Sequence, residues 1–142
     1  MTRVVLVAGA DGQVGQNLQK YADEFFVKVV AFNHRDLDIT NKNSISAVMA
    51  DVSPNAVINA AAYVAVDKAE SDQVNAYLAN EMGPKLLAEA CAFADVPLLH
   101  ISTDYVFDGI KSTPYSELDA VNPQNVYGAS KEAGERAVRS VL

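Results

Sequence analysis

The fold is decided by Arg3-Val-Val-Leu-Val-Ala-Gly-Ala-Asp-Gly-Gln-Val-Gly15, in which a short apolar run passes directly into three closely spaced glycines. The apolar run predicts a buried strand, and the residues after it show helical spacing. Gly9 permits a tight turn, Gly12 lets backbone amides approach a phosphate, and Gly15 lets helix and strand pack closely. A helix N-terminus stabilises phosphate charge. We therefore expect a dinucleotide at this turn; the alternative is a glycine-rich turn without a ligand.

Short apolar runs alternate with helix-like stretches along the rest of the chain. We predict strands at 3–8, 28–32, 56–59 and 96–102, and helices at 14–24, 43–51 and 72–94, the last kinked at Pro84. A loop over 103–123 precedes a final helix that starts near Asn125 and runs to the C-terminus. This alternation predicts an α/β fold with a doubly wound parallel sheet, of strand order 3-2-1-4.

Composition limits the classes of function. The 142 residues are 50% hydrophobic and 20% charged, which predicts one folded domain. The net charge of -7 argues against binding to nucleic acid or an anionic membrane. Cys91 is the single cysteine, so neither an internal disulfide nor a cysteine zinc site is expected. With no apolar stretch of about 18 residues, we expect a soluble, cytoplasmic protein.

Tyr127 and Lys131 lie four residues apart at the start of the last predicted helix, so their side chains share one face. An ammonium beside a phenol stabilises the phenolate, which suits a general acid that protonates a carbonyl oxygen as hydride arrives. A tyrosine and a lysine at this spacing also occur by chance, so the spacing alone does not establish a catalytic pair. Ser102 and Thr103 follow the fourth predicted strand, where a hydroxyl could hold a keto oxygen or merely cap a turn.

Asn33-His34-Arg35 follow the second predicted strand. Enzymes that use NAD carry a carboxylate near this position, where it binds the adenosine ribose 2'-hydroxyl. Here no carboxylate competes with a 2'-phosphate, and Arg35 could pair with that phosphate. We therefore predict NADP(H) as cofactor, with NAD(H) as the alternative. The other interpretation is that His34 and Arg35 are solvated loop residues.

Four blocks carry a resemblance to a known family: the glycine turn, Asn59-Ala-Ala-Ala-Tyr-Val-Ala-Val-Asp-Lys-Ala-Glu70, Ser102-Thr-Asp-Tyr-Val-Phe-Asp-Gly109, and Asn125-Val-Tyr-Gly-Ala-Ser-Lys131 with Gly134-Glu135. Together they resemble the extended short-chain dehydrogenase/reductases and, more narrowly, the dTDP-4-dehydrorhamnose reductase family. This resemblance implies reduction of the 4-keto group of a dTDP-6-deoxyhexulose to dTDP-L-rhamnose for surface polysaccharides. It covers essentially the whole chain, as a Rossmann domain over 1–142. By the resemblance, we expect the family's C-terminal substrate domain to be absent from these 142 residues.

The resemblance also implies roles for single residues. Tyr127 would protonate O4 of the sugar, Thr103 would hydrogen-bond that oxygen, and Lys131 would tune Tyr127 and bind the nicotinamide ribose. The residues expected to contact the cofactor are Gly9, Gly12, Gln13, Val14, Arg35, Asp38, Ile39, Ala60, Ala61, Ala62 and Lys131. Small residues at 60–62 also make physical sense, because bulky side chains would block a flat ligand.

Two departures from the family pattern bear on these expectations. Val64 replaces a common threonine, so one hydroxyl near the cofactor is missing. Asn17 replaces a glutamate that joins a magnesium-linked dimer in some members, so we expect no metal.

Two alternative functions stay open. One is a nucleotide-sugar epimerase or dehydratase, against which the Val-Asp-Lys-Ala-Glu block argues. The other is a non-catalytic NADP-binding regulatory subunit similar to the regulatory β subunit of methionine adenosyltransferase. For the chain as given we expect cofactor binding without turnover, and self-association through an exposed fourth strand.

Overall fold

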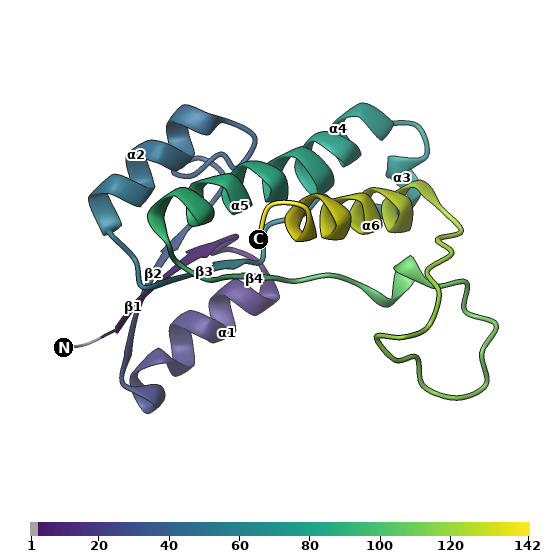
Figure 1. Cartoon of the computed structure of the whole chain (residues 1–142), viewed down its shortest axis with the longest axis horizontal. Coiled ribbons are helices and arrows are strands. Elements are labelled where there is room, and N and C mark those ends of the chain that lie inside the picture. The colour runs from purple at the N-terminus through teal and green to yellow at the C-terminus, as the bar shows by residue number, and fades with distance from the viewer. Residues whose placement is uncertain (1–2) are drawn as a thin grey trace.

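The computed structural model describes residues 3–142, which form one parallel sheet with helices on both faces (Figure 1). Its strands are β1 (Arg3–Ala8), β2 (Val27–Phe32), β3 (Ala56–Asn59) and β4 (Leu98–His100). The sequence predicts β1 and β3 with their observed bounds. It places β2 one residue late and makes β4 too long, because only three residues of that apolar run pair with β3.

The strand order is β2-β1-β3-β4, so the predicted order 3-2-1-4 is wrong. That order needs a strand on the outer side of β2. Here the chain leaves β2 through a turn and enters α2 (Lys42–Val52) directly, and the next strand pairs with β1 instead. The chain therefore passes from β1 to β2 on one side, and then crosses back to β3 on the other side of β1. This reversal of direction creates a switch point between β1 and β3. As predicted, β4 lies at an edge.

The helices divide between the two faces of the sheet. In Figure 1, α1 (Gln13–Tyr21) lies below the sheet, whereas α2, α5 (Gly83–Ala94) and α6 (Val126–Arg139) lie above it. The remaining helical segments are η1 (Ala22–Phe25), α3 (Val66–Ala69), α4 (Gln73–Tyr77), η2 (Leu78–Met82) and η3 (Asp104–Val106). The final helix ends at Arg139 and not at the C-terminus as expected.

The long helix predicted over 72–94 is interrupted where proline requires it. Pro84 occupies the first turn of α5, and the π-helical turn η2 precedes it. Proline has no amide to bond the carbonyl of Asn80. That carbonyl lies against Gly134 of α6, where a Cβ would come within 2.0 Å of it. The predicted kink is thus a π-turn, and it brings α6 close to the α4–α5 segment.

The main core lies between the sheet and the helices α2 and α5. Its buried members are Leu6, Ala8, Leu37, Ile39, Ile45, Val57, Leu87 and Cys91. Burial raises the pKa of the Cys91 thiol to about 11, so this cysteine is a core residue and not a reactive one. Within residues 3–142, no helix combines the length and apolar character needed to cross a membrane.

Candidate active site

The glycine turn lies at the switch point of the sheet. Gly9 has a φ of 94°, which side chains rarely permit, and a Cβ there would lie 2.7 Å from the backbone of Ala60. The amides of Gly9 and Ala10 both donate to the carbonyl of Phe32 at 2.9 Å. The turn is therefore fixed by β2 on one side and by the end of β3 on the other.

Gly12 and Gly15 are required for different reasons. A Cβ on Gly15 would lie 2.1 Å from the carbonyl oxygen of Gly9, so the fold itself demands glycine there. At Gly12 the nearest atom to a Cβ would be 3.6 Å away, and its φ of -76° suits any residue. The protein alone therefore does not require glycine at position 12. A ligand that approaches the backbone at this position would require glycine there.

The N-terminus of α1 has no side-chain cap. Asn41 caps α2 and Asn125 caps α6 with side-chain oxygens, whereas Gly12 offers none to α1. The first-turn amides of α1, at Gln13 and Val14, thus point out from the glycine turn without a side-chain acceptor. Oxygens of a pyrophosphate are suitable acceptors for such amides. The turn, with its open space at Gly12, fits a dinucleotide.

The three alanines at 60–62 continue this cradle. The Ala60 amide donates to the carbonyl of Ala8 at 2.9 Å, and the Ala61 amide donates to the Asn59 side chain at 3.1 Å. This segment therefore leaves β3 directly beside Gly9. Because its side chains are short, this segment leaves open space above the carboxyl ends of the strands.

The residues expected near the adenosine lie in the segment after β2. Asn33 accepts the amide of Arg35 at 2.9 Å and so fixes a turn that leaves the Arg35 side chain exposed. Hydrogen bonds from Thr40 lower the pKa of Asp38. Ile39 is only 4% exposed and packs toward Gly83, so any contact with adenine would come from its backbone.

Lys131 is buried at the carboxyl end of β4. Its side chain is 2% exposed, and its Nζ donates to the carbonyl of Ile101 at 2.6 Å. Burial lowers the pKa of this ammonium to about 8, while the charge of Glu135 opposes that fall. The α6 lysine is therefore joined to the strand end two residues before Thr103.

Tyr127 lies one turn earlier on α6 and is held by Tyr105. Their rings meet edge to face with centroids 5.5 Å apart. A Cβ on Gly128 would lie 2.2 Å from the carbonyl oxygen of Tyr105, so α6 approaches η3 at backbone distance. Thr103 caps η3, with its hydroxyl accepting the Tyr105 amide at 3.3 Å. The structure thus brings Thr103, Tyr127 and Lys131 to one edge of the sheet.

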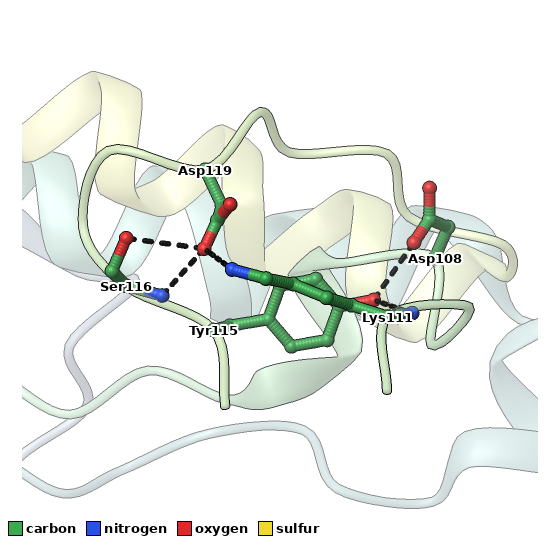
Figure 2. A network of polar contacts seen from close by, with 5 residues as sticks. All are labelled: Asp108, Lys111, Tyr115, Ser116 and Asp119. Carbon is green, nitrogen blue, oxygen red and sulfur yellow. Dashed lines mark hydrogen bonds and ion pairs between the residues drawn. The ribbon is translucent and has the colours of Figure 1, made fainter. Parts of the chain in front are cut away.

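The loop that separates Thr103 from Tyr127 is held by its own polar network. Asp119 accepts a hydrogen bond from Lys111 at 2.6 Å and two more from the backbone amide and hydroxyl of Ser116 (Figure 2). The hydroxyl of Tyr115 donates to Asp108 at 2.8 Å. The hydrogen bond from Tyr115 is the main cause of the lowered pKa of Asp108. The loop therefore has a defined shape beside the site.

Asn80 is a site residue that the sequence did not reveal. It is fully buried and pairs with the backbone of Tyr63, accepting its amide at 2.8 Å and donating to its carbonyl at 3.0 Å. It also donates to Ser130 at 2.9 Å, and Ser130 donates to the carbonyl of Tyr127. This chain of bonds links the segment after β3 to α6. Only the polarity of an asparagine within an apolar helix pattern could have pointed to it.

A glycine turn at the switch point and a Tyr-x-x-x-Lys helix packed on a neighbouring strand end together place the chain in the short-chain dehydrogenase/reductase class of Rossmann-like proteins. Comparison with known families agrees. The family described as RmlD substrate binding domain matches residues 2–142. The chain belongs to this family.

Individual relatives give the same result. The chain is 46% identical over 133 residues to a dTDP-4-dehydrorhamnose reductase of Aggregatibacter actinomycetemcomitans, covering 93% of this chain and 45% of that protein. A dTDP-4-dehydrorhamnose reductase of Bacillus anthracis, solved in complex with NADP, superposes with a TM-score of 0.95 at 38% identity, covering 99% of this chain and 50% of that one. The chain thus spans about half the length of these relatives.

Proposed function

We propose that the chain binds NADP(H) and carries the catalytic residues for reduction of the 4-keto group of a dTDP-6-deoxy-4-hexulose to dTDP-L-rhamnose. The observation that carries this proposal is the bond from Lys131 to the Ile101 carbonyl, which fixes the Tyr-x-x-x-Lys helix beside Thr103. The names of the relatives support the substrate class. Because the chain covers about half of them, cofactor binding without turnover is the function expected of these residues alone.

Each catalytic side chain has one task in this proposal. The bound cofactor supplies the hydride that reduces the carbonyl carbon. Tyr127 gives its phenolic proton to the carbonyl oxygen, so that the ketone becomes an alcohol. Thr103 donates a hydrogen bond to the same oxygen, and the Lys131 ammonium stabilises the phenolate left on Tyr127. Gln13 and Val14 offer amides to the pyrophosphate, and Ala60 to Ala62 leave room over the strand ends.

We expect NADPH to bind more tightly than NADH, because Arg35 is an exposed cation after β2 with no ion-pair partner among the described residues. Replacing Arg35 with Ala should weaken NADPH binding by roughly ten- to a hundredfold, the value of a charge-assisted hydrogen bond. NADH binding should be nearly unchanged. Calorimetric titration with both cofactors measures this difference.

Arg3→Ala is the matched control for Arg35, because Arg3 is exposed at the opposite end of β1 from the glycine turn. It should keep the preference for NADPH. An unchanged preference in the Arg35→Ala variant would remove Arg35 from the 2'-phosphate site. Wild-type protein that binds neither cofactor would contradict the proposed function itself.

We further propose a cytoplasmic protein that self-associates through β4. This strand pairs with β3 on one side only, and Leu99 in its centre is 56% exposed. An unpaired strand edge with apolar side chains favours pairing with another chain. Light scattering should show oligomers that grow with concentration and that Leu99→Lys reduces. A strictly monomeric wild-type chain at high concentration would contradict this.

A further inference from the structure

The Val-Asp-Lys-Ala-Glu block at 66–70 has no task yet in the proposed reaction. It forms the short helix α3 and the residue that ends it, Glu70. Ala69 is fully buried and belongs to the same core cluster as Tyr127, against which Val126 also packs. The block therefore forms part of the surface on which the side chain of Tyr127 packs.

Glu70 reaches the first turn of α6. The backbone amide of Val126 donates to Oε1 of Glu70 at 2.8 Å, across 56 residues of sequence. Val126 is the first residue of α6, where an amide has no acceptor within the helix. Asn125 takes the amide of Gly128 at 2.7 Å, so Tyr127 lies between two capped amides. Because α6 has no acidic residue in its own first turn, Glu70 supplies the negative charge that a helix N-terminus favours.

The segment that carries Glu70 is fixed at the cofactor end as well. Tyr63 directly follows the three alanines beside the glycine turn, and Asn80 holds its backbone amide and carbonyl. The hydroxyl of Tyr63 donates to Asp72 at 3.1 Å, and Asp72 lies two residues after Glu70. A continuous set of contacts thus runs from the cofactor side of the sheet to the start of α6.

We propose that Glu70 is a positioning residue of the active site, which caps α6 from outside the helix and so fixes Tyr127 relative to the bound cofactor. It acts through the amide of Val126 and takes no part in proton transfer. The proposal rests on the proposed function for its catalytic meaning, since Tyr127 is the proton donor only in that reaction. The contact itself is tested without turnover.

The test compares Glu70→Met with Glu70→Gln in the 142-residue chain. Both replacements are unbranched and favour helix about as well as Glu, but only Gln keeps an oxygen that accepts the Val126 amide. In Glu70→Met, exchange of the Val126 amide proton measured by NMR should be at least about tenfold faster. The ring signals of Tyr127, assigned with Tyr127→Phe, should lose part of the shift caused by the Tyr105 ring. Glu70→Gln should keep both values close to wild type.

Asp67→Asn is the matched control, because it removes an exposed carboxylate from the same short helix, three residues before Glu70. It should change neither measurement. The amide of Gly128 is an internal reference, since its acceptor on Asn125 stays in every variant. Wild-type Val126 exchange or unchanged Tyr127 ring signals in Glu70→Met would overturn the proposal, as would an equal change in Glu70→Gln or Asp67→Asn.

Removing the donor gives an independent test of the same contact. Proline suits the first position of a helix, and Asn125 already has the extended backbone that a residue before proline prefers. Val126→Pro therefore removes the amide and keeps a residue that α6 accepts. Adding Glu70→Met to Val126→Pro should shift the Tyr127 ring signals no further. A further shift as large as that in the Glu70→Met single variant would show that Glu70 does not act through this amide. Circular dichroism checks that each variant is folded.

Failure of the proposed function gives a different result, which calorimetry with NADPH detects. If the wild-type chain does not bind NADPH, the proposed function is wrong, while the NMR measurements still decide whether Glu70 fixes Tyr127. If NADPH binds and the Tyr127 ring does not respond to Glu70→Met, only the present inference is wrong.

Discussion

Replacing Tyr127 with Phe should reduce ketone reduction by about 10²- to 10⁴-fold, the usual contribution of a general acid. The phenol hydroxyl is the only group removed. The ring still packs edge to face against Tyr105, and α6 keeps the bond from Lys131 to Ile101. Binding of NADPH should therefore change little.

The measurement uses a chimera, in which this chain is followed by the second half of the Aggregatibacter actinomycetemcomitans relative, and the unsubstituted chimera is the parent for comparison. NADPH oxidation with a dTDP-4-keto-6-deoxy sugar reports turnover, and calorimetry reports cofactor binding. Tyr105→Phe is the control, because it removes a phenol hydroxyl from the neighbouring ring. Turnover near the parent level in the Tyr127→Phe chimera would exclude Tyr127 as the proton donor.

Replacing Gly15 with Ala should lower the free energy of unfolding by about 3 kcal/mol or more. A Cβ at this position would lie 2.1 Å from the Gly9 oxygen and 3.0 Å from the Cα of Ala10, and both are backbone atoms that cannot rotate away. The turn or α1 must move. Urea unfolding followed by circular dichroism measures the loss.

Gly12→Ala is the control for this loss of stability. Its φ of -76° and the 3.6 Å distance to the nearest atom leave room for a methyl group. Alanine is a poorer N-cap than glycine, so a cost of up to about 1 kcal/mol is expected. If Gly15→Ala unfolds at the same urea concentration as Gly12→Ala, the packing role assigned to Gly15 is wrong.

Local patterns in the sequence were enough for most of the fold. Continuous Val, Ile and Leu at β1 and β3 predicted both strands with their observed bounds. The glycine spacing predicted the turn at Gly9, because its chemistry depends on neighbours in sequence. The four-residue spacing of Tyr127 and Lys131 likewise placed both on one helix.

Features that depend on distant contacts were missed. The order of the strands follows from the absence of a strand between β2 and α2, which no single strand pattern reveals. Asn80 and Ser130 lie 50 residues apart, so their hydrogen bond exists only once α6 packs on η2. The burial of the Ile39 side chain against Gly83 also depends on a distant contact, while its place beside the adenine stays a prediction. The missing amide of Pro84 did predict an interruption of the helix, but not its π-helical form.

Calorimetric titration of NADPH into the wild-type chain and into Gly12→Ala tests the central claim, that the glycine turn holds a dinucleotide. The fold tolerates a methyl group at position 12, so a change in binding reports the ligand site and not stability. We expect the wild-type chain to bind NADPH, and the variant to bind at least about tenfold more weakly. No binding by the wild-type chain, or equal binding by both proteins, would contradict the account.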